Sequence, residues 1–165
     1  MNTEVIIIIV VAVLVLLGVV AFFVLKKEKF SATTPRPTLS NLQYTENIIN
    51  RLVKQLDTSN LSQTDLTSIF NLTITCINEN SVYINIAANS IPGSSDYMSA
   101  MQTISDKLYK YSGTSFYPVA QSLFDLYFSI RLYTNVLSQL NTNANYNKVL
   151  TYFPEFPSLL YFTTI

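Results

Sequence analysis

An uninterrupted apolar run near the start of the chain constrains its fold more than any other feature. Residues 5–25 read VIIIIVVAVLVLLGVVAFFVL and contain no charged side chain. A helix over these 21 residues would be about 31 Å long at ~1.5 Å per residue, which matches a hydrocarbon core of ~30 Å. We therefore expect a single transmembrane helix over 5–25, preceded by a short N-terminal tail, 1–4.

The apolar run does not have the pattern of a removable export signal. Such a signal needs positive charge before the run, a shorter apolar stretch and small residues at its end. The chain instead begins Met-Asn-Thr-Glu, and the run ends Phe-Phe-Val-Leu before two lysines. Its small residues, Ala12, Gly18 and Ala21, are never four apart, so the motif for close helix pairing is absent. These features predict a retained segment that only anchors.

Three lysines directly after the run predict how the chain crosses the membrane. Lys26, Lys27 and Lys29 follow the span, whereas Glu4 and the α-amino group precede it. The positive-inside rule then puts the N-terminus outside and the C-terminal domain on the cytoplasmic side. A lone cysteine, Cys76, cannot form an intrachain disulfide, which fits a reducing compartment.

Residues 26–40 have the composition of a linker that is basic at its start and contains proline further on. Pro35 and Pro37 favour an extended chain. At ~3.1 Å per residue, such a spacer would hold the following domain up to about 30 Å from the bilayer.

Beyond the linker, the apolar residues recur at helical spacing and predict a small α-helical bundle over 41–165. Ser40 and Ser62 each begin a capping-box pattern, so helices are expected to start after them. Residues 73–86 fit either two short alternating strands, which would form a β-hairpin, or the end of one helix and a second short helix. The helical interpretation is favoured. The fold class expected is therefore mainly α, with one N-terminal transmembrane helix.

The second half of the domain is expected to hold a helical hairpin and an irregular tail. One helix should begin after Ser94 or Ser95 and end before Gly113; the next should begin near Pro118 and run to Leu140. A short connection between them predicts antiparallel packing. The asparagine-rich stretch 141–147 is predicted to be a polar loop, and the prolines of the aromatic tail predict an irregular C-terminal segment.

The residues that most enzymes use are missing from this sequence. It contains no histidine, no phosphate-binding glycine motif and only three scattered glycines. Cys76 has no cationic neighbour in the sequence to activate it, so a buried thiol is expected. From Ser40 onward, eight acidic residues stand against six basic ones, a net charge of −2 that gives no basic face for nucleic acid. We predict no enzymatic activity, no cofactor, no metal, no small-molecule substrate and no nucleic-acid partner.

The polar composition points instead to protein contacts. Serine, threonine and asparagine make up 49 of 165 residues, and there are 11 tyrosines. Surfaces poor in charge and rich in tyrosine are typical of buried interfaces. Compositional drift in an AT-rich genome is the other explanation, although low lysine argues against it. The aromatic tail is the predicted docking site for a partner because its prolines prevent one helix from burying it; the candidate residues are Tyr152, Phe153, Phe156, Tyr161 and Phe162.

Together these features predict a membrane-anchored structural protein whose partners are the lipid bilayer and neighbouring structural proteins. The most concrete form is a minor capsid or membrane protein of a virus with an internal lipid membrane, located in the virion's inner membrane. The alternative is a module on a cellular membrane, such as a tether, an adaptor or an accessory subunit of a membrane complex.

Overall fold

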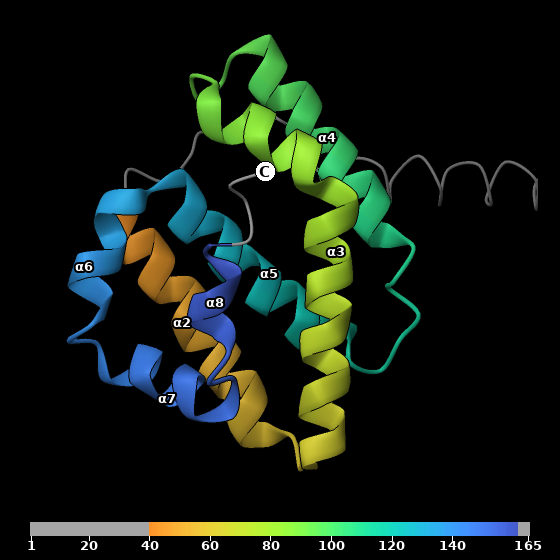
Figure 1. The fold of residues 1–165 in the computed structure, drawn as a ribbon, viewed down its shortest axis with the longest axis vertical. Helices are drawn as coiled ribbons and strands as arrows, with labels where there is room; N and C mark the ends of the chain where they lie inside the picture. Colours follow the sequence, from red (N-terminus) through yellow and green to blue (C-terminus); the bar gives the residue numbers. More distant parts are fainter. Residues whose placement is uncertain (1–39, 162–165) are drawn as a thin grey trace, which may run out of the picture. The chain divides into compact units, whose positions relative to one another are not determined.

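The computed structural model describes residues 40–161, which form a bundle of helices (Figure 1). The mainly helical fold predicted from the sequence is confirmed over this range. The predicted span 5–25, the three lysines and all but the last residue of the linker 26–40 lie outside the described residues. None of the helices within 40–161 combines the length and apolarity needed to cross a bilayer. The elements are α2 (Asn41–Thr58), α3 (Gln63–Asn89), α4 (Ser95–Tyr109), α5 (Tyr117–Leu132), the 3-10 helix η2 (Thr134–Val136), α6 (Leu137–Leu140), α7 (Ala144–Tyr152) and α8 (Phe156–Leu159).

The first two helices begin at the capping boxes predicted from the sequence. The Gln43 backbone N–H donates to the Ser40 hydroxyl, and the Ser40 N–H donates to the Gln43 side chain, each at 3.2 Å. At the start of α3, the Ser62 N–H donates to the Asp65 carboxylate at 2.8 Å. Both helices therefore have backbone donors of their first turn satisfied locally.

Helix α3 is continuous from Gln63 to Asn89, so the favoured helical interpretation of 73–86 is confirmed, whereas the β-hairpin and the expected break between two helices are wrong. The polar residues that suggested strands bond within the helix: Thr73 Oγ1 donates to the Ile69 carbonyl at 2.9 Å, and Asn80 Nδ2 to the Cys76 carbonyl at 2.7 Å. Such bonds to the preceding turn often bend helices, and Figure 1 shows the C-terminal part of α3 bending away from its first part. Its buried positions keep helical spacing: Leu66, Ile69, Thr73, Cys76, Ile77, Asn80, Ile84 and Ala87.

Helix α5 is the centre of the bundle, since its buried side chains cover most of its circumference. It runs antiparallel to α2, as shown by Thr45 Oγ1, which lies 2.6 Å from Ser129 Oγ, and by Arg51 Nη2, which donates to Asp125 at 2.5 Å. The same helix is also packed against α3. The domain core thus forms around α2, α3 and α5.

The predicted hairpin of α4 with the following helix does not form, because α4 packs antiparallel on α3 instead. Lys110, just after α4, pairs with Glu79 at 2.5 Å, and Lys107 Nζ lies 4.6 Å from the centre of the Tyr83 ring. Helix α4 buries side chains along one stripe only, so it can lie at the periphery of the bundle. Helix α5 is more apolar, and other helices must cover most of its surface. The helix predicted to reach Leu140 also ends early, at Leu132, and η2 and α6 follow.

The C-terminal region is more regular than expected. The predicted polar loop 141–147 is wrong from Ala144 onward, because the Asn143 side chain caps α7 by accepting from two backbone N–H groups at 3.0 Å. Pro157 lies in the first turn of α8, where proline is tolerated. Helix α7 lies along α2 in the same direction, with Asn145 bonded to Asn50 at 2.8 Å. The described part of the tail is therefore mostly helical and packed on its own domain.

Candidate interaction surface

The four predicted docking residues that the structure describes do not form one surface cluster. Phe153 and Phe156 are 1% and 0% exposed and belong to the hydrophobic core. Tyr152 is partly buried against the core, and its hydroxyl donates to Asp57 at 3.4 Å. Tyr161 is 79% exposed. Phe162 lies outside the described residues, so the structure leaves Tyr161 as the one fully exposed member among the four it describes.

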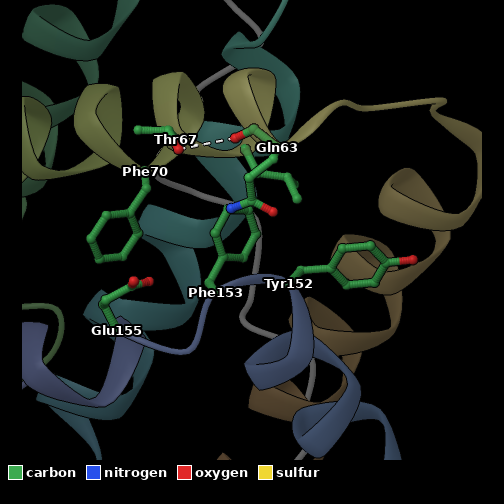
Figure 2. A pocket seen from close by; sticks show the side chains of 7 residues that line it. Gln63, Thr67, Phe70, Tyr152, Phe153 and Glu155 are labelled. Carbon is green, nitrogen blue, oxygen red and sulfur yellow. Dashed lines mark hydrogen bonds between the residues drawn. The ribbon is translucent and has the colours of Figure 1, made fainter.

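A shallow pocket lies where the tail meets the start of α3 (Figure 2). Phe153 stacks on Phe70 there, with ring centres 6.2 Å apart and planes at 18°. The pocket holds about 80 Å³, far less than the roughly 300–1,000 Å³ typical of small-molecule sites. Its lining contains a single titratable acid, Glu155, and no partner base. This pocket has room for a few waters and lacks the groups for acid–base chemistry.

A second hollow, of about 150 Å³, lies beside the last described residues. It is also small for a ligand site, and its surface is mostly apolar. The lining residues are Ile130, Arg131, Thr134, Leu137, Leu160 and Tyr161.

One thiol and two lysines in the part of the chain that the structure describes have raised pKa values. Burial raises the pKa of the Cys76 thiol to about 11, so it stays protonated at neutral pH. The hydrogen bond from Lys110 to Glu79 raises the pKa of the lysine, and the bond to Asp57 does the same for Lys148. Within 40–161, no group of three or more His, Cys, Asp or Glu side chains could hold a metal ion.

The ionic groups of the domain mostly join one helix to another. Arg51 on α2 donates to both Asp125 and Ser122 of α5, and Gln121 donates to the other Asp125 oxygen at 2.8 Å. Burial raises the pKa of the Asp125 carboxyl, although Gln121 and Arg51 oppose this effect. Lys148 on α7 pairs with Asp57 of α2 at 2.6 Å. Many of the domain's charged side chains are therefore engaged in contacts between its own helices.

Exposed aliphatic side chains gather at the C-terminal part of α3. Val82 is 64% exposed, Ile86 is 39% exposed, and Ile91, in the turn before α4, is 80% exposed. Val82 and Ile86 belong to a row of exposed positions on α3, which we call the α3 stripe: Asn71, Thr75, Asn78, Glu79, Val82, Ile86 and Asn89. We take this group of exposed aliphatic side chains as the candidate interaction surface of the domain.

Sequence reasoning missed this surface because the apolar residues of α3 are not confined to one face. Val82 and Ile86 lie two positions away from the buried Asn80 and Ile84, so the apolar pattern does not separate the outer face from the inner one. One signal was available in the sequence. Between Asn80 and Ser105 the only charged residue is Asp96, and depletion of charge is typical of interface cores.

Comparisons of the chain with protein-family models, with curated proteins and with solved structures found no match.

Proposed function

We propose that this chain is a non-enzymatic, single-pass membrane protein that links a membrane to an adjoining protein assembly. In its most concrete form it is a minor capsid or membrane protein of a virus with an internal lipid membrane. The apolar run 5–25 would anchor the chain, and Lys26, Lys27 and Lys29 would set its orientation. The helical domain beyond the linker would make the protein contacts.

One observation carries this proposal: the domain exposes aliphatic side chains in a stretch of sequence that holds a single charged residue. Val82, Ile86 and Ile91 are exposed within a stretch whose only charge is Asp96. A surface that binds charged ligands or nucleic acid needs clustered charge, whereas the centre of a protein–protein contact is depleted of it. The small pockets and the protonated Cys76 thiol point in the same direction.

The membrane part of the proposal is tested by alkaline extraction of membranes from cells that express the full chain. A double variant, Val13→Arg with Leu17→Arg, places two charges inside the run, each costing about 2.5–3.5 kcal/mol at a helix centre. We expect the unmodified chain to stay in the membrane pellet and the double variant to be released. The matched control, Val13→Leu with Leu17→Val, should stay. Release of the unmodified chain at alkaline pH would rule out the anchor.

The assembly part is tested by crosslinking the chain in its native membranes and identifying its neighbours by mass spectrometry. Several neighbours in a fixed, repeating geometry would support a structural role beside a protein shell. A single partner in one-to-one stoichiometry would instead indicate the module on a cellular membrane. If no protein is crosslinked to the domain, the linking role is wrong.

A further inference from the structure

We infer that the pocket where the tail meets the start of α3 binds the ammonium group of a lysine side chain from a neighbouring protein. The inference rests on the proposed function in treating the outside of the domain as a protein-contact surface, and it adds the chemistry of one contact. We call this site the Glu155 pocket, after the carboxylate in its lining.

The lining of the Glu155 pocket combines aromatic rings with oxygen acceptors. Phe70 and Tyr152 are partly buried, and the ring of Phe153 stacks on that of Phe70. Figure 2 shows the Glu155 side chain turned toward the Phe70 ring, with Gln63 across the pocket from it. A cation is attracted to the face of an aromatic ring within about 6 Å of its centre, and a carboxylate or amide oxygen accepts hydrogen bonds from an ammonium group. The pocket therefore brings together both kinds of group that recognise a cation.

The Glu155 carboxylate differs from most carboxylates of the described domain in having no partner there. Within residues 40–161, its side chain makes no capping hydrogen bond to α8 and takes part in no ion pair. Asp96 also lacks such a bond, but it lines neither of the two pockets described above. The other carboxylates accept a hydrogen bond from another residue: Glu46, Asp57, Asp65, Glu79, Asp106 and Asp125. Glu155 therefore presents a negative charge beside aromatic rings that a cation from outside the domain can balance.

The size of the pocket favours lysine over arginine. The pocket holds about 80 Å³. An ammonium group is close in size to a water molecule, which occupies about 30 Å³ in the liquid, so it fits together with the end of the lysine stem. A guanidinium is planar and wider, and it typically binds a carboxylate through two parallel hydrogen bonds. The ammonium is a compact charge with three donors, which the Glu155 carboxylate, the Gln63 amide oxygen and water can accept.

The test is coupling of carboxylates to amines with a water-soluble carbodiimide, applied to the full chain in its native membranes. This reagent joins a carboxylate directly to a lysine amine without a spacer, so it reports only pairs that are in contact. Mass spectrometry then identifies the linked residues. Asp106 is the matched control on the same chain, because its carboxylate is also exposed but already accepts a hydrogen bond from Gln102.

Two variants test the aromatic part of the site. Phe70→Leu keeps an apolar side chain packed against the core and removes the ring that would face the ammonium group. Phe124→Leu is its control, because it removes a ring stacked on Phe128 in α5, outside the pocket. A cation–π contact at an exposed site corresponds to a factor of about two to five in affinity. We therefore expect Phe70→Leu to lower the yield of the Glu155 link by about this factor and Phe124→Leu to leave it unchanged.

We expect Glu155 to be linked to a lysine of another protein molecule with a yield several times that of Asp106. Equal yields at the two carboxylates would indicate random contact and overturn the inference. A Glu155 yield that Phe70→Leu leaves unchanged would also overturn it, as would links that join Glu155 only to lysines of its own molecule. If neighbours are linked only through other residues of the domain, the lysine site is wrong and the linking role stands. Release of the chain by alkaline extraction would reject the membrane anchor without changing the result at Glu155.

Discussion

The aromatic tail and the C-terminal part of α3 differ in opposite ways from what their sequences suggest. The tail, with its prolines and phenylalanines, has the composition of a docking segment, yet Phe153 and Phe156 are core residues. The C-terminal part of α3 resembles an ordinary helix, yet it exposes Val82 and Ile86. Large aromatic side chains bury the most surface, so they stabilise the domain that carries them. A group of neighbouring exposed aliphatic side chains is therefore a better candidate for a contact surface than the aromatic composition of a segment.

The largest expected effect is on the stability of the fold and concerns the buried phenylalanines of the tail. Phe156→Ala should destabilise the domain by about 3–5 kcal/mol, because it removes a fully buried aromatic side chain and leaves a cavity. Chemical denaturation of the full chain in detergent, followed by circular dichroism, measures this change. Tyr161→Ala is the control on the same segment and should change stability by less than about 1 kcal/mol, because that side chain is exposed. Equal effects of the two substitutions would show that the tail is not packed as described.

A second expected effect concerns the reactivity of Cys76. A thiol of pKa about 11 holds roughly one hundredth of the thiolate at pH 8 that a thiol of pKa 9.0 holds, and burial also blocks access. Alkylation of the native chain should therefore be very slow and become fast on unfolding, as mass spectrometry can follow. Because the folded pKa is raised, the thiol stays protonated in the fold but ionises in the unfolded chain between about pH 9 and 11. Stability should therefore fall as pH rises through that range.

A smaller effect is expected at the ion pair that holds α4 to α3. The bonds from Lys110 and Tyr111 lower the pKa of Glu79, so the folded state favours the carboxylate more than the unfolded state does. Its contribution is present above the usual glutamate pKa and is lost as pH falls through the lower, folded value. Glu79→Gln should thus be less stable than the unmodified chain at pH 7 and equally stable at low pH, as measured by denaturation at each pH. A difference that persists at the acid end would mean that the carboxylate charge is not the cause.

The smallest effect on stability is expected at the α3 stripe. Val82→Ser should change the unfolding free energy by no more than about 0.5 kcal/mol, because that side chain is 64% exposed, and Ile86→Ser should destabilise by about 1 kcal/mol, because Ile86 is only 39% exposed. Both variants should nevertheless weaken crosslinking of the domain to its protein neighbours in native membranes, which mass spectrometry would reveal. Destabilisation as large as that of Phe156→Ala would place these side chains in the core.

Local rules predicted where the first helices begin. The Ser40 and Ser62 capping boxes, the Ser94 cap and Pro118 in the first turn of α5 were all predicted, because each depends only on residues a few positions apart. The buried Cys76 was also predicted. These features need no knowledge of which helix packs on which.

Packing was predicted less well, because it depends on which helix becomes central. Helix α5 is buried over most of its circumference and packs against both α2 and α3, whereas α4 packs mainly on α3. The tail was misjudged for a related reason: Asn143 and Pro157 act as helix starts rather than as breaks. The exposure of Val82 and Ile86 could not be predicted from the spacing of apolar residues, because the inner and outer faces of α3 both contain them.

Residue-level footprinting of the full chain in native membranes, compared with the chain dissociated in detergent, tests the central claim most directly. If the α3 stripe is the contact surface, Val82 and Ile86 will be labelled in detergent and protected in the membrane, while Tyr161 will be labelled equally in both. If Tyr161 is protected in the membrane and the stripe stays labelled, the tail is the docking surface and the claim is wrong.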